Sequence, residues 1–133
     1  MKPWRALAAG AAAAVVVGLA ACGNGPPQSS GSGGGGGASC PGTAGASVGS
    51  PEVKVSASDS LQFAPTSATA KVGQVVNWTN TGSVLHNITF DQSCLTDSNF
   101  APQGTWQIKF SQAGTYAYKC TIHPGMNGSL TVS

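Results

Sequence analysis

From about residue 51 onward, apolar and polar side chains alternate along a series of short segments. Val53 and Val55 are each followed by a polar residue, and so are Val76 and Trp78. A period of two residues is typical of strands that bury one face. The same alternation recurs at Ala68, Ala70 and Val72, at His86, Ile88 and Phe90, at Trp106, Ile108 and Phe110, at Tyr116, Tyr118 and Cys120, and at Leu130 and Val132.

Turn-forming residues separate these segments, at Gly73, at 80–82 and at Gly114. No segment shows the 3.6-residue period of a helix. Several short strands at this interval predict an all-β sandwich or barrel. Residues 92–103 fit no regular element, and we expect a loop there.

The first 50 residues follow a different pattern. Lys2 and Arg5 precede an unbroken run of sixteen small and apolar residues, 6–21, which Cys22 follows. A basic start, a short apolar run and a small-residue cleavage site predict a secretory signal peptide over residues 1–21. Residues 19–22, LAAC, resemble a bacterial lipobox, which implies that Cys22 is lipidated after cleavage. An uncleaved transmembrane anchor is the alternative, although this run is short for crossing a bilayer.

Residues 22–50 consist mainly of Gly, Ser, Pro, Ala and Thr, which predicts a flexible tether. The folded domain is expected over residues 51–133. This organisation predicts an exported domain held by a lipid on the outer face of the cytoplasmic membrane, at the cell surface or in the periplasm. The tether would let the domain move between membrane partners, or would only hold it clear of the envelope.

The formal net charge of +2 belongs to the predicted signal peptide. Without Lys2 and Arg5, the chain has four lysines and four acidic residues, so its formal net charge is zero. No basic patch remains that would indicate a nucleic-acid partner.

Four side chains are candidate metal ligands. Cys120, His123 and Met126 follow one another closely after a predicted strand, and His86 starts another. Two imidazoles, a thiolate and a weak thioether are the set that suits a copper ion alternating between Cu(II) and Cu(I). Gly125 can take the positive φ of a tight reversal, which would bring Met126 back toward the other three.

The remaining cysteines then form a candidate pair. If Cys22 is lipidated and Cys120 binds a metal, Cys40 and Cys94 are left over in an oxidising compartment. We expect a disulfide between them. The alternative is that Cys40 stays free or pairs with another chain.

Two stretches resemble a known family. FAPTSATAKVGQVVNWTNTGSVLHNITF, residues 63–90, and GTYAYKCTIHPGMNG, residues 114–128, are similar to small blue-copper cupredoxins of the plastocyanin and amicyanin type. The two-residue gap between His123 and Met126 resembles amicyanin. The resemblance implies a Greek-key β-sandwich of about eight strands.

The resemblance also implies roles for single residues. His86, Cys120 and His123 would be the equatorial copper ligands and Met126 the axial one. Asn87, with Thr121 beside it, would support the ligands by tying the two ligand loops together. His123 would reach the surface through an apolar patch, formed by Pro124 and Gly125 with Leu85 or Met126.

We therefore expect a monomeric, membrane-tethered blue copper protein that carries single electrons between redox proteins or membrane complexes, docking near His123. We expect no enzymatic activity, because two histidines are too few for a second copper centre. Structural zinc fits poorly with a thioether ligand, and a Cys120 nucleophile would lack a third group to orient its base. The alternatives are copper capture or delivery in the envelope, which methionine-rich or histidine-rich tracts would favour, and a surface module without metal.

Overall fold

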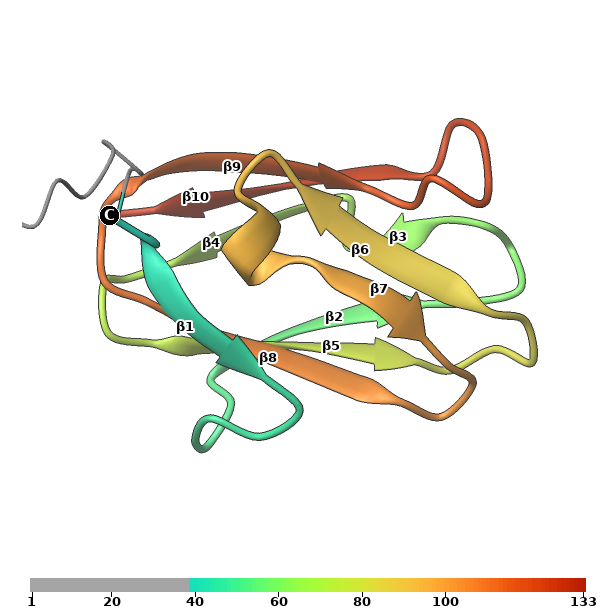
Figure 1. Cartoon of the computed structure of the whole chain (residues 1–133), viewed down its shortest axis with the longest axis horizontal. Coiled ribbons are helices and arrows are strands. Elements are labelled where there is room, and N and C mark those ends of the chain that lie inside the picture. Colours follow the sequence, from blue (N-terminus) through green and yellow to red (C-terminus); the bar gives the residue numbers. More distant parts are fainter. Residues whose placement is uncertain (1–38) are drawn as a thin grey trace, which may run out of the picture. The chain divides into compact units, whose positions relative to one another are not determined.

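The computed structural model describes residues 39–133, which form two β-sheets packed face to face (Figure 1). The strands are β1 (Gly42–Gly45), β2 (Val53–Ala57), β3 (Phe63–Ala64), β4 (Ser67–Ala70), β5 (Val75–Asn80), β6 (His86–Phe90), β7 (Asp97–Phe100), β8 (Thr105–Phe110), β9 (Gly114–Lys119) and β10 (Asn127–Val132). A short 3₁₀ helix, η1 (Ser93–Leu95), lies between β6 and β7. The predicted signal peptide and Cys22 lie outside the described residues.

The first sheet has the strand order β1-β8-β5-β2-β3 and the second the order β4-β10-β9-β6-β7. The pairs β2–β5 and β4–β10 are parallel, and the other pairs are antiparallel. The prediction of an all-β sandwich is confirmed. The alternation in β9 shows why: Tyr116 and Tyr118 are buried, whereas Thr115, Ala117 and Lys119 are exposed.

Residues 92–103 do not form the continuous loop that we expected. They contain η1 and the strand β7, which pairs with β6. Phe100 is buried at the end of β7, while Ser98 and Asn99 are exposed, so one large apolar residue holds the strand in place. A single apolar position creates no periodic signal, which is why the sequence pattern missed this strand.

Residues 42–45 were expected within the tether, but they form β1 and pair with β8. A Cβ atom at Gly42 would lie 2.8 Å from the Lys109 carbonyl oxygen, so only glycine allows this close approach. Cys40 and Cys94 form a disulfide that joins the start of this segment to η1. The domain therefore includes a strand on the N-terminal side of residue 51.

Aromatic side chains from both sheets fill the core. Trp78 of β5 and Tyr118 of β9 meet edge to face, with ring centroids 5.5 Å apart, and Phe63 of β3 contacts Tyr118 in the same way at 4.9 Å. Such contacts stabilise a core by about 0.5–1.5 kcal/mol each beyond the burial of area. Cys120 and Met126 belong to the same buried cluster. Two of the four candidate metal ligands are therefore part of the core itself.

The loops that follow β2, β5 and β9 gather at one end of the sandwich, on the right in Figure 1. This end carries the candidate metal ligands. Val72, which we expected on a strand face, lies beyond the end of β4 and is exposed. Within residues 39–133, no helix is long and apolar enough to span a membrane.

Candidate metal centre

Two segments of chain supply the candidate ligands. His86 is the first residue of β6, and Cys120 directly follows β9 on the buried side of that strand. His123 lies in the loop between β9 and β10. Gly125 has a φ of 84° in this loop, the left-handed conformation that glycine adopts without strain.

Backbone hydrogen bonds close the same loop. The Cys120 N–H donates to the Met126 carbonyl at 2.9 Å, and the Met126 N–H donates to the His123 carbonyl at 3.2 Å. These bonds hold the ends of the loop together. The positions of the three candidate ligands within it are therefore fixed by the backbone as well as by side-chain packing.

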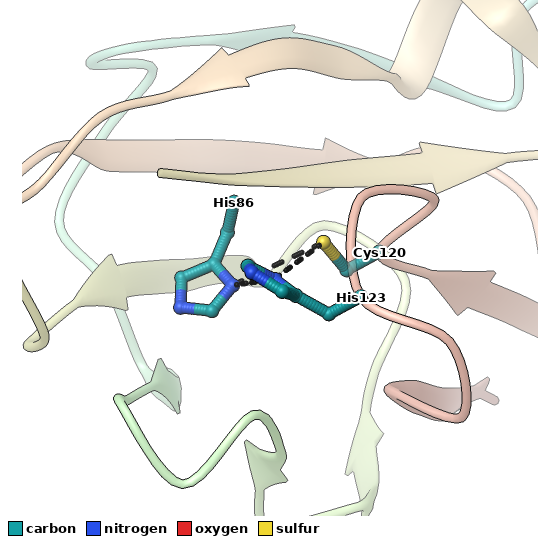
Figure 2. Close-up of side chains that lie close together, drawn as sticks. All are labelled: His86, Cys120 and His123. Carbon is teal, nitrogen blue, oxygen red and sulfur yellow. Dashed lines mark hydrogen bonds between the residues drawn. The ribbon is translucent and has the colours of Figure 1, made fainter. Parts of the chain in front are cut away.

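Figure 2 shows the side chains of His86, Cys120 and His123 converging on one point. The two imidazole Nδ1 atoms lie 3.1 Å apart. The Cys120 Sγ atom lies 3.5 Å from Nδ1 of His123 and 3.9 Å from Nδ1 of His86. The three atoms thus form a triangle with sides of 3.1, 3.5 and 3.9 Å.

This triangle fits a metal ion. A point equally distant from the three atoms would lie about 2 Å from each, close to the bond lengths between first-row metals and imidazole nitrogen. When neither Nδ1 carries a hydrogen and the thiol is ionised, all three atoms present lone pairs to one another, and a cation among them would be stabilised. Two nitrogens and one thiolate in a trigonal arrangement are the donor set of a blue-copper site.

Burial controls the protonation of His86. The side chain is fully buried, and this desolvation lowers the pKa of His86, with a further decrease from the charge of the facing His123. The Ser58 carbonyl opposes the decrease, although no hydrogen bond of regular geometry forms at the buried Nε2 atom. A lowered pKa keeps the imidazole neutral at neutral pH, which is the form that binds a metal.

Asn87 links the two segments that carry the candidate ligands. Its backbone N–H donates to the Cys120 Sγ atom at 3.4 Å. Its side-chain oxygen accepts the Thr121 N–H at 2.8 Å, and its side-chain nitrogen donates to the Thr121 hydroxyl at 2.7 Å. Three hydrogen bonds from one residue therefore hold β6 against the residues that carry the thiol.

Met126 is buried, with 1% of its surface exposed, at the base of the loop. It therefore does not belong to an exposed patch, which was one of the two options that we considered. Leu85, the other option, is 42% exposed. Met126 stays our prediction for the axial ligand.

The residues that support the loop before His86 could not be recognised in the sequence. Asn80 was read only as a turn residue, yet it is fully buried and donates to the carbonyls of Val84 and Phe100 at 2.9 and 3.0 Å. Asp59 accepts hydrogen bonds from the same loop. A single asparagine or aspartate among turn residues belongs to no sequence pattern that would identify it as a supporting residue.

Comparison with known proteins decides the family. The model of copper binding proteins of the plastocyanin/azurin family matches residues 51–133. The chain belongs to this family of copper-binding proteins. Plastocyanin of Scenedesmus fuscus is 38% identical over 88 residues, which cover 56% of this chain and 90% of that protein. Amicyanin-alpha of Methylorubrum extorquens is 34% identical over 92 residues, covering 65% of this chain and 75% of the relative.

Solved cupredoxin structures share the fold. A reduced Cu(I) form of an amicyanin variant superposes with a TM-score of 0.58 at 28% identity, over 66% of this chain and 88% of that chain. Membership of the plastocyanin/azurin family and the fit of the donor triangle agree on the metal. The cofactor of this cupredoxin is copper.

Proposed function

We propose that this cupredoxin is a one-electron carrier whose copper is held by His86, Cys120 and His123, with Met126 as the axial ligand. The observation that carries the proposal is the preformed donor triangle, with separations of 3.1 to 3.9 Å. Copper, when bound, would gain or lose one electron by alternating between Cu(II) and Cu(I). A ligand set that is already in place needs little rearrangement between the two oxidation states.

The protein residues hold the donors and keep water out. His86, Cys120 and Met126 are buried, whereas His123 is half-buried. His123 therefore connects the interior of the site with the surface. Asn87 and Thr121 fix the thiol through the hydrogen bonds described above, and a loss of these bonds would loosen the site.

Apolar side chains surround the end of the sandwich where His123 lies. Five large apolar side chains of the described chain are exposed, and four of them, Leu61, Val84, Leu85 and Ile122, belong to the loops at this end. An apolar rim without a concentration of charge favours contacts with a weak salt dependence. This surface is our candidate docking site for redox proteins or membrane complexes.

A hollow on the described domain lies away from the candidate ligands. This hollow of about 330 Å³ lies on the outer face of the second sheet, between Thr89, Asp91, Lys119 and Asn127 among others. None of the candidate ligands lines it. A substrate in this hollow would not touch the donor atoms.

The proposed setting is outside the cytoplasm. Cleavage after residue 21 and lipidation of Cys22 would anchor a monomer to the outer face of the cytoplasmic membrane, at the cell surface or in the periplasm. The glycine-rich tether would leave the docking end free to meet partners. These features belong to residues outside the described part of the chain and rest on the sequence.

Titration of the copper-free protein with Cu(II) tests the proposal. We expect one equivalent of copper to produce an intense visible colour from charge transfer between the Cys120 thiolate and Cu(II). Cys120→Ser should lose this colour, and Met126→Ala should keep it with a changed midpoint potential. Colourless binding of one copper would contradict the carrier and favour a protein that captures or delivers copper.

A further inference from the structure

We propose that Asp59 is a positioning residue for the copper site, which fixes the turn that brings His86 to the metal. Asp59 lies in the loop between β2 and β3, far from His86 in sequence. The inference rests on the proposed copper ligation by His86. Asp59 is exposed, and its proposed role depends on the contacts that its loop makes with the turn before β6.

The Asp59 carboxylate accepts three hydrogen bonds from the turn before β6. Oδ1 accepts the backbone N–H of Ser83 at 2.7 Å and that of Val84 at 3.3 Å, and Oδ2 accepts the Ser83 hydroxyl at 2.9 Å. Hydrogen bonds to an ionised carboxylate are stronger than those between neutral groups. The turn is therefore tied to the loop of residues 58–61.

Val84 is held from both sides. Asp59 accepts its N–H, and the buried Asn80 side chain donates to its carbonyl at 2.9 Å. Both backbone polar groups of this residue are thus fixed two positions before His86. Little freedom remains for the chain between Val84 and the first residue of β6.

The turn and the Asp59 loop also fit together closely. A Cβ atom at Gly82 would collide with Oδ1 of Asp59 and lie 2.9 Å from its backbone nitrogen. Thr81 donates its N–H and its hydroxyl to the Ala57 carbonyl at 2.8 and 3.1 Å, two residues before Asp59. The loop that carries Asp59 therefore packs directly against the turn before β6.

Glu52 offers a matched control. It lies before β2, whereas Asp59 follows the same strand, and its Oε2 atom accepts the Val75 N–H at 2.7 Å. β2 and β5 run parallel, so this bond lies at the end of the two strands opposite to the copper site. Glu52→Ala removes a similar carboxylate hydrogen bond without touching the turn before His86.

The experiment compares copper-loaded Asp59→Ala, Asp59→Asn, Ser83→Ala and Glu52→Ala with the wild type. We expect Asp59→Ala to lower the affinity for Cu(II), measured by competition with a chelator, roughly tenfold. The charge-transfer band and the copper hyperfine splitting should shift with it. Asp59→Asn, which keeps an acceptor oxygen, should be intermediate, and Glu52→Ala should match the wild type.

Two results would overturn the inference. Equal affinities and spectra in the Asp59 and Glu52 variants would show that Asp59 only stabilises the fold. If Asp59→Ala does not fold, Asp59→Asn and Ser83→Ala decide, and wild-type spectra in both would refute the role. Absence of colour in the wild type would instead refute the proposed ligand set, so the two failures are distinguishable.

Discussion

Asn87 connects the two segments of the candidate copper site by hydrogen bonds, although it is not itself a candidate ligand. It donates to the thiol sulfur and makes two further hydrogen bonds to Thr121. Supporting residues of this kind orient the ligands and affect metal affinity about 10- to 100-fold. The position directly after His86 gives Asn87 access to both ligand segments.

We predict that Asn87→Ala weakens copper binding by about 10- to 100-fold, because the Thr121 N–H loses its acceptor and the Cys120 segment can shift. Chelator competition measures the affinity. Asn77→Ala is the control, since Asn77 is equally buried and hydrogen-bonded, to Thr79 and Gln107 in the other sheet. An equal loss of affinity in both variants would mean that the effect is general destabilisation.

The Asp59 carboxyl should titrate below its ordinary value of 3.8, because hydrogen bonds from the Ser83 backbone and side chain lower its pKa. The unfolded chain takes up this proton at higher pH than the folded one. The contribution to stability is therefore present above pH 3.8 and lost as the pH falls through the folded pKa. An NMR titration of the copper-free protein measures the carboxyl directly, and a midpoint at or above 3.8 would contradict the hydrogen-bonded turn.

At the scale of elements, β1 extends the first sheet, and the disulfide ties the start of this segment to η1. β1 lies before the segment that matches the family, residues 51–133, and covers the edge of β8. Unpaired strand edges favour association with other chains. The disulfide between Cys40 and Cys94 keeps this covering strand attached.

Replacing both Cys40 and Cys94 by serine should destabilise the domain by about 4 kcal/mol as an upper figure, because the bond closes a loop with a sequence separation of 54. Denaturant unfolding measures the loss. The visible colour of the folded variant should not change, since neither residue contacts the copper ligands. A free energy of unfolding equal to that of the wild type would contradict this role.

The elements differ in how well their sequence predicts them. In β9, large apolar and polar residues alternate, and the strand and its inward cysteine follow directly from the period of two. In β1, the sequence Gly-Thr-Ala-Gly has no large side chain, and pairing with β8 and the disulfide decide its conformation. In β7, Phe100 is the one buried residue, and pairing with β6 supplies the rest of the support. Tertiary contacts, invisible in the local pattern, therefore account for the missed strands.

The candidate ligand set could be proposed from the sequence for a related reason. Cys120, His123 and Met126 are close in sequence, and the chain has one other histidine, His86. The supporting contacts of Asp59 and Asn80 were not predictable, because they depend on which loops meet at the end of the folded sandwich. Chemistry carried by rare residue types can be recognised in a sequence, whereas support by common polar residues needs the structure.

At the scale of the whole molecule, the proposal joins a lipid anchor, a tether and a domain whose exposed apolar residues lie mostly at one end. An anchor on one segment and a docking surface on another allow a carrier to meet membrane partners without leaving the membrane. In this proposal the tether would supply reach, and His123, which is half-buried, would supply the contact with the partner.

Cys22→Ser should release the protein from the membrane, since the lipid would have no attachment site. Fractionation of cells and labelling with a fatty acid measure the anchor, and the released protein should keep its colour with copper. Persistence of the variant in the membrane fraction, without fatty-acid label in the wild type, would favour an uncleaved transmembrane anchor.

Anaerobic reductive titration of the copper-loaded protein tests the central proposal most directly. We predict that one electron per chain removes the colour, that reoxidation restores it over repeated cycles, and that the copper stays bound throughout. Release of Cu(I) on reduction, or failure to recover the colour on reoxidation, would contradict the electron carrier.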